Sequence, residues 1–329
     1  MKGLSRRRAM SILGGLIAAP ALRGIAHAQR PVPLLAILEP SSASSPPGGA
    51  RSFREALAKL GWAEGRTIRI ETRYGEWRLD RMAAMARELV ALRPDVLYTH
   101  SDQGARAAMQ ATATIPIVVG ASADLVAVAG MRSVAQPGGN VTGVSANQPE
   151  LDRKRLEILK EAVPVASKIA YVFNRAAIAD VALQALDQSA RHLGVRIVRA
   201  GIDEPGQTEA AFAAVAREGA QAVLVQDSVI LSRHSDRVTA LALKHRLPAI
   251  SQIPSFAERG GLLQYGADVP EMFRRSAGHV DRILKGAKAG ELPIEQPTKV
   301  DLIVNQRTAK ALGITIPPAI LARADRVIE

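Results

Sequence analysis

Short apolar runs alternate with segments of helical period along residues 34–119. Apolar residues recur every three or four positions in an amphipathic helix, whereas a buried strand is a continuous apolar run of about four to eight residues. These patterns predict strands at residues 34–38, 67–72, 95–98 and 115–119, and helices at residues 51–60, 78–92 and 103–111. The alternation of strand and helix predicts a parallel sheet with helices on both faces.

The same pattern recurs in the second half of the chain. After a helix that follows Glu150, we expect strands at 168–173, 195–199, 222–226 and 247–252, and helices at 178–193, 207–217 and 233–245. The stretch DVLYTHS begins at residue 95, and the similar stretch AVLVQDS begins at residue 222. An inexact repeat of two α/β units predicts two similar lobes rather than a solenoid, whose period would be about 20–50 residues.

A glycine-containing stretch follows each unit, PGGNVTGVSAN at 137–147 and GGLLQYGAD at 260–268. We interpret both as crossovers between the lobes, with hinges near residues 142–145 and 262–266. This interpretation places residues 30–145 plus 268–298 in lobe one, including a helix at 272–284, and residues 148–263 in lobe two. Residues 299–329 hold a strand at 300–304 and helices, and either lobe could contain them.

The first 28 residues match a cleavable signal peptide. Basic residues between Lys2 and Arg8 precede an apolar run at 9–22, and Ala26-His27-Ala28 is a small-x-small cleavage site, so we expect cleavage before Gln29. The apolar run is shorter than the about 20 residues of a membrane-spanning helix. Export to the periplasm is therefore predicted, by the general secretory (Sec) route or by the twin-arginine route.

Charge and cysteine content narrow the function classes. Loss of the five basic residues of the signal peptide brings the formal charge from +12 to +7. The basic residues are spread along an exported chain without interleaved aromatic residues, which excludes a nucleic-acid-binding function. The absence of cysteine excludes disulfides and thiolate metal sites.

Long ordered stretches resemble the ABC transporter substrate-binding protein family, whose known ligands include tryptophan and tyrosine. The stretches that carry the resemblance are LGWAEGRTIRIETRYGEWRLDRMAAMARELVALRPDVLY, ATIPIVVGASAD, VAQPGGNVTGVS, KHRLPAI, GGLLQYGAD, HVDRILKG and QPTKVDLIVNQRTAKALGITIPPAILARADRVIE. They cover nearly the whole chain after the signal peptide. The resemblance implies the type I periplasmic binding protein fold, with two Rossmann-like lobes of parallel sheets, crossover strands between them and a ligand in the cleft.

This resemblance also implies a function and partners. A periplasmic solute-binding protein captures a small polar solute, here an amino acid or a similar compound, and delivers it to an ABC importer. Its partners would be the small-molecule ligand, the importer permease and the ATPase of that importer, with the binding protein itself a monomer. The ligand-capturing subunit of a periplasmic sensor system is the alternative, because it too needs only export and a cleft.

Candidate ligand-binding residues follow the predicted strands, because ligands of open α/β sheets bind outside the carboxyl ends of the strands. Polar residues stand at these positions in both halves of the chain: Glu39, Ser41, Ser101, Asp102, Gln103, Ser122, Asn174, Arg175, Asp227, Ser228 and Gln252.

Two of these residues carry charges that suit an amino acid, since Arg175 could bind a carboxylate and Asp227 an ammonium group. Pseudo-symmetry of the repeat predicts that Ser101 and Asp227 meet the ligand from opposite lobes. The alternatives are that Ser101 and Asp102 only cap a helix and that the charged residues form surface ion pairs.

Aromatic residues make up only 3% of the chain. Trp77, Phe256 and Tyr265 lie near predicted strand ends or in a crossover, although core packing is the more common role of such residues. This sparse supply argues against an aromatic ligand.

Enzymatic functions lack sequence support. The chain has neither a phosphate-binding loop nor a G-x-S-x-G elbow, and its histidines include no pair at helical ligand spacing. We therefore expect no enzyme activity, no catalytic residue, no cofactor and no metal. A sugar-responsive repressor shares the two-lobe fold, but it needs a DNA-binding domain where this chain has a signal peptide.

Overall fold

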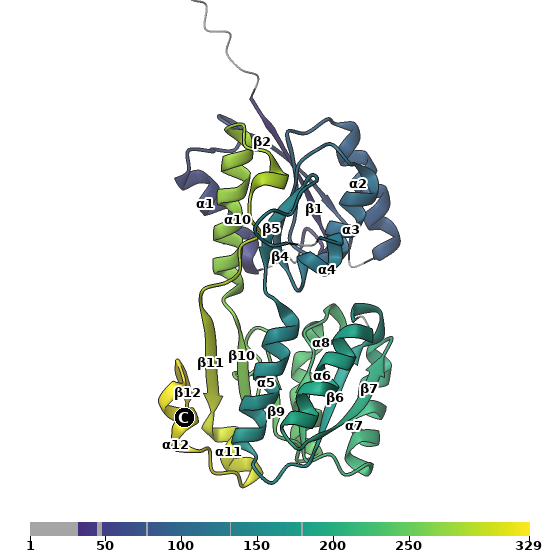
Figure 1. The fold of residues 1–329 in the computed structure, drawn as a ribbon, viewed down its shortest axis with the longest axis vertical. Helices are drawn as coiled ribbons and strands as arrows, with labels where there is room; N and C mark the ends of the chain where they lie inside the picture. Colours follow the sequence, from purple (N-terminus) through teal and green to yellow (C-terminus); the bar gives the residue numbers. More distant parts are fainter. Residues whose placement is uncertain (1–31, 45–47, 77, 132, 179) are drawn as a thin grey trace, which may run out of the picture. The chain divides into compact units, whose positions relative to one another are not determined.

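A computed structural model describes residues 32–44, 48–76, 78–131, 133–178 and 180–329, and Figure 1 shows its ribbon. The predicted signal peptide and its cleavage site lie outside these residues, as does Trp77. Within the described part of the chain, no helix is both long enough and apolar enough to cross a membrane.

A five-stranded sheet is built from the first part of the chain. Its strands are β1 (Leu34–Glu39), β2 (Arg69–Tyr74), β3 (Val96–Thr99), β4 (Ile117–Ser122) and β5 (Val141–Ser145). The strand order is β2-β1-β3-β4-β5, and all neighbouring strands are parallel. The interior strand β1 is buried along its whole length, as expected for a parallel sheet covered on both faces.

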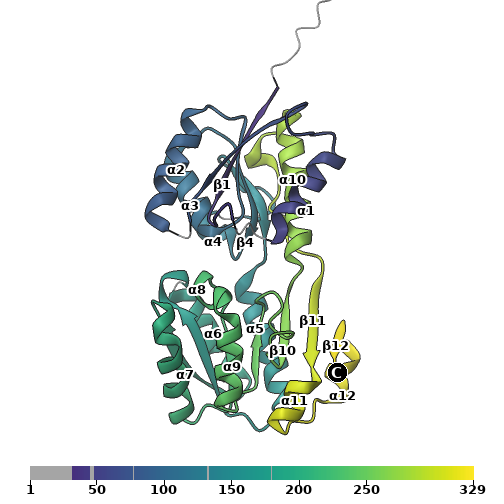
Figure 2. The same cartoon turned by 180° about the vertical axis from the view of Figure 1, so that it is seen from behind.

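Helices cover both faces of this sheet. They are α1 (Gly48–Lys59), α2 (Leu79–Ala91), α3 (Asp102–Ala111), α4 (Leu125–Ala129) and α10 (Val269–Leu284), with a short 3-10 helix η3 (Ala289–Glu291). Side chains alternate between the faces of a strand. Leu35 and Ile37 of β1 therefore pack against α1 and α10, whereas Ala36 and Leu38 pack against α2 and α3. Figure 2 shows α1 beside α10 and α2 beside α3.

The second part of the chain forms a seven-stranded sheet. Its strands are β6 (Lys168–Asn174), β7 (Arg196–Ile202), β8 (Ala222–Val225), β9 (Ala249–Ser251), β10 (Leu263–Ala267), β11 (Val300–Asn305) and β12 (Arg326–Ile328). The strand order is β12-β11-β10-β9-β8-β6-β7. Its β7-β6-β8-β9-β10 portion repeats the order of the first sheet, as the similarity between DVLYTHS and AVLVQDS predicts.

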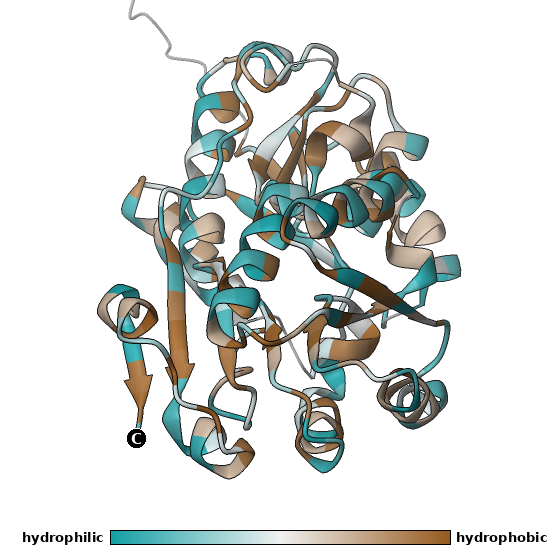
Figure 3. Cartoon of the chain, turned by 60° about the horizontal axis from the view of Figure 1, so that its bottom comes forward, coloured by the Kyte–Doolittle hydropathy of each residue, from teal (hydrophilic) through white to brown (hydrophobic). Residues whose placement is uncertain are grey.

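Two apolar cores lie on opposite faces of the second sheet. The helices of this second part of the chain are α5 (Gln148–Ala162), η1 (Arg175–Ala177), α6 (Asp180–His192), η2 (Pro205–Gln207), α7 (Thr208–Arg217), α8 (Val229–Arg233), α9 (Ser235–Lys244), α11 (Gln306–Leu312) and α12 (Pro318–Arg323). Helices α5 and α6 contribute to one core and α7 to α9 to the other. In Figure 3 the strands are largely hydrophobic in colour, whereas the helices carry both colours.

The chain passes between the two sheets three times. Strand β5 leads into α5 through residues 146–147, β10 leads back into α10 at Asp268, and residues 296–299 lead into β11. These passages mix segments that are distant in sequence, and β11 and β12 place residues 300–328 in the second sheet. The division into lobes that move separately stays a prediction.

Two features of the strands add to what the sequence predicts. Strand β11 runs antiparallel to β10, because the chain returns from α10 at the end of the sheet where β10 leaves it. The predicted hinge segments 142–145 and 262–266 are largely strand residues of β5 and β10, which pair with their neighbours in the sheets. Rotation about regularly paired strands would break backbone hydrogen bonds.

Candidate ligand-binding site

The carboxyl end of β1 lies at a switch point of the first sheet. The connection from β1 leads to β2 on one side, whereas β3 flanks β1 on the other side. Ligands of open α/β sheets bind at such a point. Glu39 ends β1, Tyr74 ends β2, and His100 directly follows β3, so these side chains meet at one edge of the sheet.

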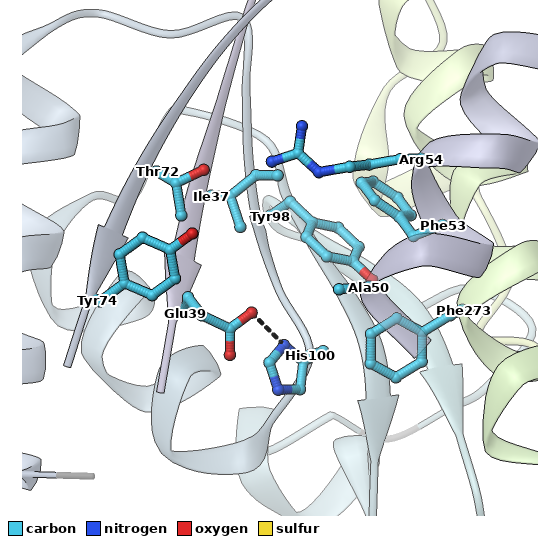
Figure 4. Close-up of a pocket in the computed structure, with 10 residues that line it drawn as sticks. All are labelled: Ile37, Glu39, Ala50, Phe53, Arg54, Thr72, Tyr74, Tyr98, His100 and Phe273. Carbon is cyan, nitrogen blue, oxygen red and sulfur yellow. Dashed lines mark ion pairs between the residues drawn. The ribbon is translucent and has the colours of Figure 1, made fainter. Parts of the chain in front are cut away.

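A small pocket with a volume of about 60 Å³ opens at this edge. Figure 4 shows that its residues come from β1, β2, β3, α1 and α10. The lining residues are Ile37, Glu39, Ala50, Phe53, Arg54, Thr72, Tyr74, Tyr98, His100 and Phe273. Four of the eleven Phe, Tyr and Trp residues of the chain therefore line one pocket.

Glu39 is held firmly at the base of this pocket. Its Oε1 atom accepts hydrogen bonds from the backbone N–H (3.2 Å) and the hydroxyl (2.9 Å) of Ser41. Its Oε2 atom lies 3.3 Å from Nδ1 of His100, and Figure 4 marks this ion pair. Only 5% of Glu39 is exposed, so its position is set by these contacts and not by solvent.

Aromatic rings form one wall of the pocket. The rings of Phe53 and Tyr98 stack with their centroids 3.9 Å apart, and those of His100 and Phe273 lie 5.2 Å apart. The hydroxyl of Tyr98 lies 3.2 Å from that of Ser276, and burial strongly raises the pKa of Tyr98. Tyr98 is therefore a neutral part of the wall.

The predicted residues at the start of α3 have structural partners. Ser101 caps the helix, since its hydroxyl accepts a hydrogen bond from the N–H of Gly104 at 3.0 Å. The carboxyl of Asp102 accepts hydrogen bonds from the Ser122 hydroxyl and from the N–H of Ala123 (3.2 Å). Burial raises the pKa of Asp102. The neighbouring Gln103 is half-buried.

Two predicted residues at the end of β6 also make local contacts. The side chain of Asn174 caps η1 by accepting a hydrogen bond from the N–H of Ala176 at 2.9 Å. Arg175 forms an ion pair with Asp203 at 2.5 Å, and both side chains are more than half exposed. A surface ion pair was the alternative considered for Arg175, and the structure shows such a pair.

Asp227 and Ser228 follow β8 at the carboxyl edge of the second sheet. Ser228 caps α8 by accepting a hydrogen bond from the N–H of Leu231 at 3.4 Å. The carboxyl of Asp227 accepts a hydrogen bond from the hydroxyl of Ser232. Burial raises the pKa of Asp227, although the Ser232 hydroxyl and the Arg155 guanidinium oppose this shift. The residue as a whole is half-buried, so a ligand can reach its edge.

Arg155 is the central residue that sequence reasoning missed. It lies on α5 with 0% of its surface exposed. Its guanidinium donates hydrogen bonds to the carbonyl oxygen of Tyr265 (2.8 Å), to Asp152 and to Oε1 of Gln252. The predicted residue Gln252 thus belongs to a buried network that also approaches Asp227.

A sequence signal for Arg155 was present. Arg155 lies four residues after Leu151 and four before Leu159, which are both buried. Residues at this spacing share one face of a helix, so Arg155 stands on the apolar stripe of α5. A charged residue on such a stripe needs a buried partner.

The network holds two carboxyl groups for one guanidinium. Burial raises the pKa of Asp152, and Arg155 opposes only part of this shift. Two buried polar atoms, Oε1 of Gln148 and the hydroxyl of Tyr171, make no hydrogen bond within the described residues. The edge of the second sheet is therefore polar and negatively biased.

The remaining aromatic candidates do not form a site. Phe256 is buried in the core beneath α8 and α9, the role expected for it by default. Tyr265 is partly buried and packs against the other core. In the described part of the chain, no group of three or more potential metal ligands comes together.

The fold and the sheet edges together define a class of protein. Two α/β sheets with the same core strand order each present polar residues at their carboxyl edges, and the chain passes between them three times. This is the architecture of a two-lobed binding protein for small molecules.

Comparison with known proteins gives the family. Residues 35–328 match the family described as ABC transporter substrate binding protein, and the chain belongs to this family. A tyrosine-binding protein from Clostridioides difficile (strain R20291) is 26% identical over 265 residues, which span 80% of this chain and 76% of that protein.

Solved structures show the same fold. A conserved domain protein from Vibrio cholerae is 27% identical, with a TM-score of 0.81 over 90% of this chain and 100% of that chain. An ABC domain from Streptococcus pneumoniae in complex with L-Trp is 20% identical, with a TM-score of 0.81 over 90% of this chain and 99% of that chain. The expected type I periplasmic binding protein fold is confirmed.

Proposed function

We propose that this substrate-binding protein captures an amino acid with an aromatic side chain and delivers it to an ABC importer. The observation that carries the proposal is the pocket at the β1 switch point, where aromatic rings surround one buried carboxylate. Aromatic walls favour a flat ring by stacking and edge contacts. The tyrosine named for one relative and the L-Trp bound in another fit the same chemistry.

The gathering of these rings changes the expectation drawn from composition. A low overall content of aromatic residues argued against an aromatic ligand, yet Phe53, Tyr74, Tyr98 and Phe273 line a single pocket. A binding site needs a local concentration of rings, and the average over the chain does not report on it.

The head group of the amino acid would contact the second sheet. Asp227 is the candidate for the ammonium group, because it lies at the carboxyl edge of the second sheet and the residue is half-buried. Arg155 would act through Gln252 by holding that amide in place. Arg175 is a weaker candidate for the carboxylate, since it already pairs with Asp203 on the surface.

The proposal also includes a location in the cell and transport partners. The predicted signal peptide would export the chain to the periplasm, where it would work as a monomer without enzymatic activity. The permease of an ABC importer would accept the loaded protein, and the ATPase of the importer would drive uptake. Closure around the ligand would rotate the short connections at residues 146–147, Asp268 and 296–299, because β5 and β10 are held by strand pairing.

Mass spectrometry of small molecules released from the purified protein tests this function directly. A thermal-shift panel of the standard amino acids and uncharged sugars should find stabilisation by an aromatic amino acid, since a ligand at 100 times its Kd adds about 2.7 kcal/mol. Stabilisation by uncharged sugars alone would contradict the proposal. Deletion of the gene for this protein should abolish uptake of the same amino acid if the protein serves an importer, and should leave uptake unchanged if it serves a sensor.

A further inference from the structure

The Glu39 carboxylate has one oxygen atom committed and one that faces the pocket. Both hydrogen bonds from Ser41 go to Oε1. The Oε2 atom faces Nδ1 of His100, which makes no hydrogen bond within the described residues. The pocket therefore presents a fixed hydrogen-bond acceptor among aromatic walls (Figure 4).

We infer that Glu39 is a specificity-determining residue that selects aromatic rings carrying a hydrogen-bond donor over plain phenyl rings. The inference rests on the proposed function, because it assumes that the pocket takes the side chain of an amino acid. A phenol hydroxyl or an amino group on the ring would donate to Oε2 of Glu39. A phenyl ring entering the same pocket would take water away from this carboxylate without replacing the lost hydrogen bond.

The energetic basis is the penalty of a buried carboxylate oxygen that loses its hydrogen-bond donor, because the ion pair of Oε2 with His100 includes no hydrogen bond. A site built to bond a polar group of its ligand rejects the analogue that lacks this group, because the site's own polar atoms are left without partners. Glu39 is buried and anchored by Ser41, so it cannot turn to solvent when the donor is missing. Hydrogen bonds to charged groups correspond to an affinity change of about tenfold or more.

Three amino acids serve as probes in isothermal titration calorimetry: L-tyrosine, 4-amino-L-phenylalanine and L-phenylalanine. The wild-type protein should bind the first two at least about tenfold more tightly than L-phenylalanine. The amino compound is the sharper probe, because its ring nitrogen is mainly a donor, whereas a phenol hydroxyl can also accept.

The variant Glu39→Gln should remove this preference. The two donors of Ser41 would hold the amide oxygen of the glutamine, so its NH2 group would take the place of Oε2 and present donors instead of an acceptor. The affinity ratio between 4-amino-L-phenylalanine and L-phenylalanine should then fall to within about threefold.

The control is Asp281→Asn, which neutralises another buried carboxylate on α10. Asp281 accepts a hydrogen bond from Nε1 of Trp62 at 2.9 Å, and it does not line the pocket. This variant should keep the wild-type affinity ratio. If Glu39→Gln does not fold, Ser41→Ala replaces it, because loss of the hydroxyl releases the carboxylate and should lower the ratio about threefold.

Equal affinity of the wild-type protein for the three probes, or an unchanged ratio in Glu39→Gln, would overturn the inference. Binding of none of the probes would overturn it as well. That last result would leave the proposed delivery of amino acids standing if the thermal-shift panel finds another amino acid. Failure of the whole panel would instead count against the proposed function.

Discussion

The carboxyl edge of the first sheet gathers aromatic rings around one anchored carboxylate, whereas the edge of the second sheet gathers a buried guanidinium, two carboxyl groups and an amide. Both edges belong to sheets with the same core strand order. The residues after corresponding strands nevertheless differ, with His100 after β3 and Gln226 and Asp227 after β8. The repeated strand order determines where a site can form. The side chains that follow the strands determine which part of a ligand each edge can bind.

Under the proposed function, the two edges would bind different parts of the same amino acid. Ring contacts and one acceptor suit the apolar end of an amino acid, and dense charge suits its head group. The first edge obtains its rings from α1 and α10, which pack together on one face of the sheet. At the second edge, the charged groups of Arg155 and Asp152 come from α5.

The largest expected effect is that of Arg155→Met on stability. Removing the guanidinium leaves Asp152 as an uncompensated buried carboxyl, so the free energy of unfolding should fall by about 3–5 kcal/mol. Urea denaturation measures the change. The matched control is Arg175→Met, whose exposed pair with Asp203 should matter by less than about 0.5 kcal/mol. Equal effects of the two substitutions would refute the contrast between a buried network and a surface pair.

The next prediction concerns Asp227→Asn, which should weaken binding of the amino acid by about 1.5–3 kcal/mol. Stability should stay unchanged or rise, because burial of the ionised Asp227 is unfavourable, as its raised pKa indicates. Calorimetry and urea denaturation report the two quantities separately. The control is Asp203→Asn, which breaks the surface pair with Arg175 and should leave affinity unchanged. A loss of stability without a loss of affinity would assign Asp227 a purely structural role.

The packing of the first edge can be tested at Gly120 in β4. A Cβ atom at this position would lie 2.0 Å from the hydroxyl of Tyr98, which forms part of the pocket wall. Gly120→Ala should therefore lower the free energy of unfolding by about 1–3 kcal/mol and weaken ligand binding. At Gly278 in α10 an added Cβ would meet nothing within 4 Å among the described residues, so Gly278→Ala should raise stability by about 0.5–1 kcal/mol. Unchanged affinity in Gly120→Ala would argue against this wall as a ligand contact.

Much of the fold could be predicted because the signal for it is local. The apolar run of β1 and the helical period of α2 are visible in single stretches of sequence, and the similarity of DVLYTHS to AVLVQDS indicates the repeated unit. The antiparallel β11 could not be predicted in this way. Its direction depends on the point where the chain returns from α10, which no local pattern encodes.

The site was harder to predict because it depends on contacts distant in sequence. The strand-end rule singled out Glu39, Asp227 and Gln252, whose side chains do lie at the two edges. The rule could not find the pocket wall, because Phe53 and Phe273 come from helices 220 residues apart in the sequence. It also could not separate ligand contacts from caps such as Ser101, since polar residues at helix starts serve both roles.

The smallest effect concerns the dependence of stability on pH at the second edge. The folded-state pKa of Asp227 is raised above 3.8, the ordinary value that applies in the unfolded chain. Between these two values the folded protein holds a proton that the unfolded chain has lost. The stabilising contribution of this group is therefore complete below pH 3.8 and is lost as the pH rises through the folded-state pKa. The slope that one such group adds cannot exceed about 1.4 kcal/mol per pH unit.

Urea denaturation of the wild-type protein and of Asp227→Asn from pH 7 downward measures this slope. The free energy of unfolding of the wild-type protein should rise, relative to that of the variant, as the pH falls toward 3.8. Asp152 is shifted in the same direction, and the Asp227 charge contributes to that shift, so the difference between the curves reports the two coupled carboxyl groups together. Gly278→Ala changes no titratable group and should displace the curve without altering its slope. Parallel curves for the wild-type protein and Asp227→Asn would mean that the Asp227 carboxyl is well hydrated, and the second edge would then resemble an ordinary polar surface.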